Sequence, residues 1–93
     1  MASYFNRNLK ILRKALEKKR GRILDMDIIA ALSGFSSIKL QSWERDGNAN
    51  LSELKKLVAF YSRVLEMELT LDQINNRDLR YDKRFADIAW KSM

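Results

Sequence analysis

The sequence predicts a small all-α domain. Its 93 residues are enough for a single hydrophobic core and too few for two. The chain contains no proline and only three glycines, and this composition favours helices joined by tight turns over a sheet of many strands. Several stretches repeat apolar residues every three or four positions, which is the spacing of amphipathic helices.

The first predicted helix ends near Gly21. Phe5, Leu9, Leu12 and Leu16 form its apolar stripe, while lysines and arginines follow another face. A glycine at the end of such a pattern is typical of a helix C-terminus. We expect the apolar stripe to lie in the core and the basic stripe in solvent. Binding of this helix to a membrane surface is the alternative, but the rest of the chain can cover the stripe with a core of its own.

Four further helices are predicted from capping residues that stand before apolar stretches. Two short helices cover residues 26–33 and 36–45, and their boundaries are marked by Asp25, Gly34, Ser36 or Ser37, and the turn Asp46-Gly47-Asn48. Two capping boxes open the next two helices, Asn50 with Glu53 and Thr70 with Gln73. A last helix is expected over about residues 82–91.

The net charge of +6 belongs to the N-terminal part of the chain. Residues 1–22 carry a net charge of +7, residues 23–50 carry −2 and residues 51–93 carry +1. A localised cationic face favours a polyanionic partner, such as nucleic acid or an anionic membrane. A basic helix that is merely solvated is the simpler alternative.

The composition excludes several kinds of site. The chain has no histidine and no cysteine, so disulfides, thiol chemistry, histidine bases and the usual zinc ligands are absent. The carboxylate pair Asp25 and Asp27 fits the start of a helix better than a catalytic site, and Ser36 and Ser42 have no base to activate them. We therefore expect no enzyme, no cofactor and no metal. Without a signal peptide or a membrane-spanning run, we expect a soluble cytoplasmic protein.

Residues 26–45 meet the spacing rules of a helix-turn-helix. Such a unit needs a small residue where its helices approach and, four positions later, a residue that tolerates positive φ; Ala30 and Gly34 stand at these positions. It also needs apolar anchors beneath both helices, and four residues have that spacing: Ile29, Phe35, Leu40 and Trp43. An ordinary helical hairpin is the alternative, but it would meet only one or two of these requirements by chance.

The stretch from Leu24 to Gly47 resembles the helix-turn-helix domain of the phage repressor and Cro family, the XRE type. The matching residues are Leu24, Ile29, Ala30, Gly34, Ser36, Leu40, Trp43 and Glu44. The likeness extends from about Phe5 to Ile74 and implies a compact five-helix bundle of the lambda-repressor-like type over residues 1–75. It also implies a prokaryotic or phage regulator of transcription, associated with the nucleoid, that inserts its third helix into the major groove of double-stranded DNA as a homodimer.

The resemblance and the charge pattern together give a set of candidate DNA contacts. Four residues of the third helix would reach base edges: Ser37, Ile38, Gln41 and Ser42. Seven others would lie at the DNA backbone: Arg20, Arg22, Met26, Ser36, Lys39, Arg45 and Asn48. None of the base readers makes the bidentate contact of arginine with guanine, so base discrimination should be modest. Met26 replaces the family's usual glutamine and cannot donate a hydrogen bond. The resemblance also makes Arg13 the expected partner of Glu44.

These features leave two possible functions for the chain and two possible roles for its C-terminal segment. A DNA-binding repressor is the first expectation, and a protein-binding module of the same fold, such as an antirepressor or an antitoxin, is the alternative that an exposed Ile38 would favour. Residues 76–93 lie outside the likeness and offer an apolar stripe: Phe85, Ile88, Ala89 and Trp90. This stripe either pairs two copies, with their reading helices about 34 Å apart, or packs on its own domain.

Overall fold

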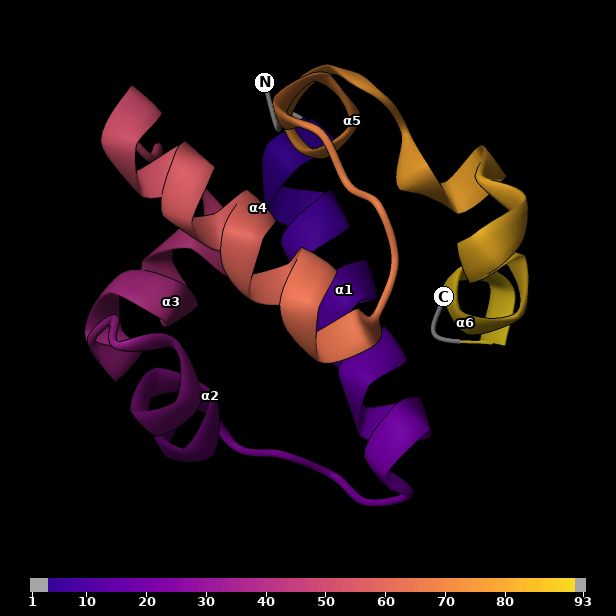
Figure 1. Ribbon diagram of the computed structural model, residues 1–93, viewed down its shortest axis with the longest axis horizontal. Coiled ribbons are helices and arrows are strands. Elements are labelled where there is room, and N and C mark those ends of the chain that lie inside the picture. Colours follow the sequence, from indigo (N-terminus) through magenta and orange to yellow (C-terminus); the bar gives the residue numbers. More distant parts are fainter. Residues whose placement is uncertain (1–3, 92–93) are drawn as a thin grey trace.

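Helix α1 (Tyr4–Arg20) lies at the centre of the fold, and most other helices contact it directly (Figure 1). After it come, in chain order, α2 (Met26–Ser33), α3 (Ser37–Arg45), α4 (Leu51–Leu65), α5 (Leu71–Asn76), the 3-10 helices η1 (Leu79–Tyr81) and η2 (Lys83–Phe85), and α6 (Ala86–Lys91). This computed structural model describes residues 4–91, without the side chains of residues 89–91, and the described chain contains no strand. The prediction of an all-α fold is therefore confirmed.

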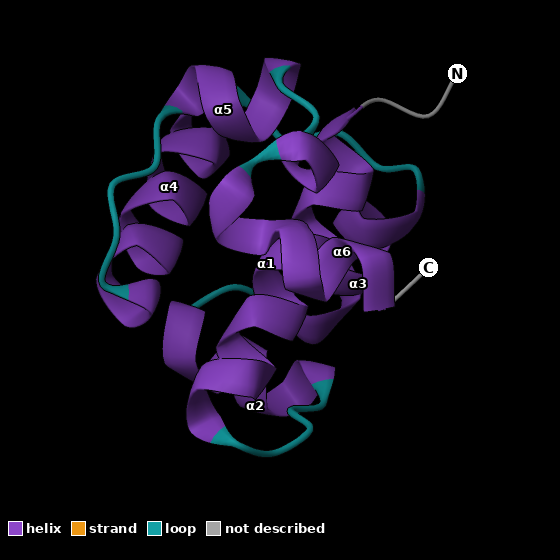
Figure 2. Cartoon of the chain, turned by 90° about the vertical axis from the view of Figure 1, so that its right-hand side faces the viewer, coloured by secondary structure: helices purple, strands orange, loops and turns teal. Residues whose placement is uncertain are grey.

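The other elements are distributed on two sides of α1. Figure 1 shows α2 and α3 on one side and the elements from η1 to α6 on the other, while α4 crosses α1. Figure 2 shows that the loops between the helices are short, and the links from α1 to α2, from α3 to α4 and from α4 to α5 cover residues 21–25, 46–50 and 66–70. Among the described residues, no helix combines the length and the apolar character needed to cross a membrane.

Local capping sets the helix boundaries, as the sequence predicts. The side chains of Asp25 and Ser36 accept hydrogen bonds from backbone amides in the first turns of α2 and α3, so Ser36 is the cap that is used. Both capping boxes are formed, at the starts of α4 and α5. Gly34 takes a φ of 84° after α2, in the left-handed region that glycine adopts without strain. Four predicted helix starts are thus confirmed.

The C-terminal segment differs from the single helix expected over residues 82–91. Asp78 and Asp82 each accept a hydrogen bond from the backbone amide two residues further on, and each of these bonds opens a 3-10 turn. Aspartate side chains compete in this way with α-helical hydrogen bonding. The α-helix therefore begins only at Ala86.

One hydrophobic core includes the C-terminal segment. Leu79 and Phe85 are buried in the same cluster as the apolar stripe of α1, and Ile88 packs against that cluster. Phe85 has 0% of its surface exposed, so its side chain is not available to a second copy in this structure. Phe85 and Ile88 thus pack on their own domain, which is the second of the two expected roles. Ala89 and Trp90 lie outside the residues whose side chains are described.

Asn8 holds the C-terminal segment against α1. Its side chain is fully buried, and its amide nitrogen donates to the backbone oxygens of Ile74 (2.8 Å) and Arg77 (2.6 Å). Its side-chain oxygen accepts from the backbone amide of Leu79 at 3.1 Å. A buried amide is costly without such partners, so the bonds also fix the segment that supplies them. One side chain of α1 therefore holds the end of α5 and the start of η1.

Replacing Asn8 by alanine should destabilise the whole chain, because buried backbone groups of the C-terminal segment lose their partners. We expect the free energy of unfolding, measured by urea denaturation, to fall by about 3 kcal/mol. Asn75→Ala is the matched control, because Asn75 is exposed on α5. The control should change the free energy by less than about 0.5 kcal/mol. Equally small effects of both substitutions would show that Asn8 does not make the connection.

Candidate nucleic-acid interface

Helices α2 and α3 form a contacting pair joined by a tight turn. Ile29, Leu40 and Trp43 are buried beneath the two helices. Phe35 is half-buried and packs edge-on against Trp43, with the ring centroids 4.9 Å apart. The anchors that the sequence predicts for this pair are therefore in place.

A buried ion pair attaches α3 to α1. The Nε of Arg13 lies 3.1 Å and 2.9 Å from the two carboxylate oxygens of Glu44, which is only 7% exposed. Burial opposes the charge on Arg13, but the hydrogen bond and the charge of Glu44 outweigh it and raise the pKa of the guanidinium. The partner that the resemblance implies for Glu44 is thus confirmed. The pair joins the middle of α1 to the C-terminal half of α3.

Asn6 makes a second attachment between the same two helices. Its side-chain nitrogen donates to the backbone oxygens of Trp43 at 2.6 Å and of Gly47 at 2.9 Å. Trp43 lies in the last turn of α3, where helix carbonyls lack partners within the helix, and Gly47 lies in the turn that follows α3. The sequence does not predict this contact, because an asparagine in an amphipathic pattern does not indicate a partner some forty residues away.

The face of α3 that points away from the core carries the predicted base readers. Ile38 is 78% exposed, and Gln41 is exposed about one turn further on. Ser37 and Ser42 are half-buried, and a Cβ added at Gly47 would collide with the side-chain oxygen of Ser42. Ile38 and Gln41 are therefore the most accessible of the four residues, whereas Ser42 lies against the protein's own turn.

The residues around α3 that are predicted to contact the DNA backbone differ in whether their charges are already paired within the protein. Arg45 is exposed at the end of the helix and forms no ion pair with any described residue. The Nζ of Lys39, by contrast, lies 2.7 Å from a carboxylate oxygen of Glu53 on α4, and this hydrogen bond lowers the pKa of the Glu53 carboxyl. A phosphate would have to displace Glu53 to reach Lys39. The sequence did not reveal this pair, because its members belong to different helices.

Three other residues are predicted to contact the DNA backbone, and each of them is partly buried or makes a hydrogen bond within the protein. The hydroxyl of Ser36 accepts the hydrogen bond that caps α3. Met26 is half-buried at the start of α2. Asn48 is exposed, and its backbone oxygen accepts from the indole nitrogen of Trp43 at 3.3 Å. The hydrogen bond of Asn48 uses its backbone oxygen, so the exposed side chain of Asn48 takes no part in it.

The basic stripe of α1 is partly neutralised. Three of its cations are paired with acidic residues from later in the chain: Arg7 with Asp78 (3.6 Å), Lys18 with Asp87 (3.7 Å) and Lys19 with Glu66 (2.9 Å). Lys10, Lys14, Arg20 and Arg22 pair with none of the described residues, and we call these four side chains the unpaired cations. They are the positive groups of this region that remain for a partner.

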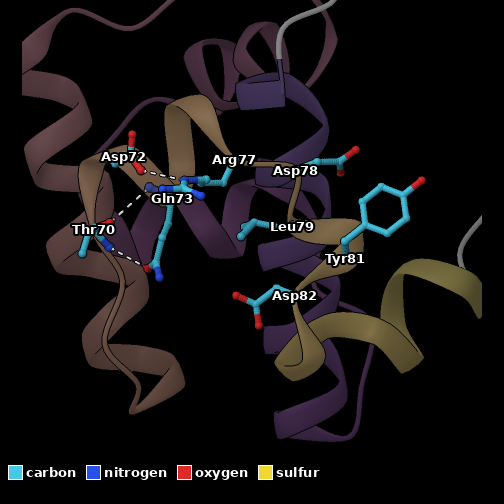
Figure 3. A pocket seen from close by; sticks show the side chains of 8 residues that line it. All are labelled: Thr70, Asp72, Gln73, Arg77, Asp78, Leu79, Tyr81 and Asp82. Carbon is cyan, nitrogen blue, oxygen red and sulfur yellow. Dashed lines mark hydrogen bonds and ion pairs between the residues drawn. The ribbon is translucent and has the colours of Figure 1, made fainter.

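An open cavity of about 610 Å³ lies between the start of α5 and the two 3-10 turns (Figure 3). Its lining consists of Thr70, Asp72, Gln73, Arg77, Asp78, Leu79, Tyr81 and Asp82. Each of its carboxylates is bonded to an arginine, and these bonds lower the pKa of all three: Asp72 to Arg77, Asp78 to Arg80 and Asp82 to Arg84. In the described part of the chain, no group of three or more acidic residues is arranged to hold a metal ion.

Comparison with known proteins adds no relative. No protein-family model matches the chain, and no curated protein and no solved structure matches it. The interface is therefore interpreted from its own residues.

A double-mutant cycle tests the attachment of α3. Arg13→Met should lower the free energy of unfolding by about 3 kcal/mol, because it leaves the buried carboxylate of Glu44 unpaired. Glu44→Gln should lower it by less, because Arg13 keeps Glu17 as an ion-pair partner at 3.6 Å. The double substitution should cost less than the sum, with a coupling energy of about 2 kcal/mol by urea denaturation. The exposed pair Arg77 and Asp72 is the control, and the cycle of Arg77→Met with Asp72→Asn should show no measurable coupling. Additive effects at Arg13 and Glu44 would contradict a coupled pair.

Proposed function

We propose that the chain is a sequence-specific DNA-binding regulator of transcription, with repression as its expected outcome. In this proposal α3 of a lambda-repressor-like domain enters the major groove of double-stranded DNA. The observation that supports it is the outward face of α3, where Ile38 and Gln41 are exposed on a helix that buried contacts hold on α1. A helix fixed in this way can align its exposed residues with a row of base edges.

In this proposal, the residues that attract DNA differ from those that recognise its bases. The unpaired cations attract DNA over a long range and release counterions from its phosphates. The centre of α3 carries no unpaired charge, because Lys39 is paired with Glu53. Ile38 packs on a thymine methyl group, and Gln41 is suited to the bidentate contact with adenine.

A homodimer is part of the proposal. Two copies related by a two-fold axis would place their α3 helices about 34 Å apart and read two half-sites on one face of the DNA. The contact between copies lies outside Phe85, because that side chain is in the core. Sedimentation of the full chain with and without DNA tests the dimer; a chain ending at Ile74 is unsuitable, since it would lose the buried side chains of Leu79 and Phe85.

Selection of bound sequences from random duplex DNA should return a defined motif, and the affinity for that motif should fall steeply as the salt concentration rises. Ile38→Ala and Gln41→Ala should each relax the preference at one base pair by about 1–3 kcal/mol. The exposed Asn75 on α5 provides the control, and Asn75→Ala should leave the motif unchanged. Weak binding without a motif would overturn the proposal.

A protein-binding module, such as an antirepressor or an antitoxin, is the second candidate. The observation that favours it is the exposure of large apolar side chains in the link and at the starts of α3 and α4: Ile23 is 86% exposed, Ile38 78% and Leu51 60%. Exposed apolar side chains are frequent at protein interfaces. Asp25 and Asp27 add negative charge at the start of α2, which suits a protein partner better than DNA.

Co-purification from the native cell separates the two candidates. If the chain is a protein-binding module, a specific partner should co-purify with it and be lost on Ile38→Asp, while binding to DNA is unaffected. Ala59→Asp introduces the same charge on the exposed face of α4 and serves as the control. Loss of the partner with both variants, or recovery of a DNA motif that Ile38→Asp abolishes, would contradict the protein-binding function.

A further inference from the structure

The link between α1 and α2 is folded around Glu17. The backbone amides of Gly21 and Arg22 donate to the backbone oxygen of Glu17 at 2.8 Å and 3.1 Å, which closes the end of α1. Gly21 has a φ of 72°, a conformation that favours glycine at this position. The backbone amide of Leu24 donates to the side-chain carboxylate of Glu17 at 2.8 Å. One residue therefore holds both ends of the link.

The carboxylate of Glu17 also connects the link to α3. Its Oε2 lies 3.6 Å from a guanidinium nitrogen of Arg13, and the Nε of the same guanidinium is bonded to Glu44. The three side chains are largely buried, so water screens their interactions only weakly. A continuous polar chain thus runs from the amide of Leu24 through Glu17 and Arg13 to α3.

Two of the unpaired cations stand on this link or at its start. Arg20 ends α1, Arg22 follows Gly21, and both side chains are exposed. Leu24 is buried and anchors the far end of the link in the core. The backbone oxygen of Glu17 closes the end of α1, and its carboxylate fixes the Leu24 end of the link, so the position of the two arginines relative to α3 depends in part on this side chain. Glu17 is also the only acidic residue among the first 22 of the sequence.

We propose that Glu17 is a positioning residue that holds Arg20 and Arg22 at DNA backbone phosphates while α3 lies in the groove. This role rests on the proposed DNA-binding function and adds to it. Arginines on a loose link would attract DNA but would not bind defined phosphates. With Glu17 in place, the same polar chain orients the phosphate contacts and the base-reading helix, so that both engage the DNA in one register.

The salt dependence of DNA affinity tests this role, because it counts phosphate contacts and is not changed by a loss of stability in a chain that remains folded. For the duplex recovered by selection, the slope of log K against log salt should become less steep by about 1–2 in Glu17→Ala, since each lost phosphate contact contributes about 0.9. Glu17→Gln keeps an oxygen for the amide of Leu24 and should retain most of the slope. Glu68→Ala removes the same charge at an exposed site of the 66–70 loop and should leave the slope unchanged.

A combination of variants separates positioning from simple loss of charge. Replacing Arg20 and Arg22 together by glutamine should reduce the slope by about 2 in the otherwise unaltered chain. In the Glu17→Ala background, the same replacement should reduce it by much less, because the contacts are already lost. Equal reductions in both backgrounds, or an unchanged slope in Glu17→Ala, would overturn the positioning role of Glu17 and leave the proposed DNA-binding function standing. A chain that selects no duplex would overturn the proposed function and this role with it.

Discussion

A buried ion pair between Arg13 on α1 and Glu44 on α3 sets the geometry of the candidate interface. Glu44 is buried and Arg13 is half-buried, so the carboxylate depends on the guanidinium for the hydrogen bonds that its two oxygens would otherwise make to water. This requirement leaves α3 little freedom to slide or roll on α1, and Asn6 adds a second attachment at the C-terminal end of α3. The outward position of Ile38 and Gln41 follows from this placement.

The same helix organises the rest of the chain through buried polar side chains. Asn8 holds the C-terminal segment on α1, and Glu17 holds the link to α2. Because the C-terminal segment lies against α1, its acidic residues neutralise part of the basic stripe, as in the pair of Arg7 with Asp78. The net charge of +6 therefore overstates the positive charge that α1 offers to a partner. What remains is carried by Lys10, Lys14 and the link.

Features that depend on neighbours in the sequence could be predicted, and features that depend on distant partners could not. The caps at Asp25 and Ser36 and both capping boxes are local, and they are confirmed. The family resemblance, and not the spacing of residues, predicts Arg13 as the partner of Glu44. The pair of Lys39 with Glu53 and the bonds of Asn8 join residues from different helices, so no periodicity indicates them. The 3-10 turns were missed because a helical pattern does not show that Asp78 and Asp82 bond to their own following backbone.

The most direct test of the account is a map of backbone amide chemical shifts in the full chain, titrated with the duplex recovered by selection. If α3 reads the bases and the link binds phosphates, the largest changes should fall on residues 37–48 and 20–24. Amides of α5, at the N-terminal end of α1, and of η1 to α6, on the side of α1 away from α2 and α3, should change little (Figure 1). Changes confined to α5 or to the C-terminal elements, with α3 unaffected, would contradict the account.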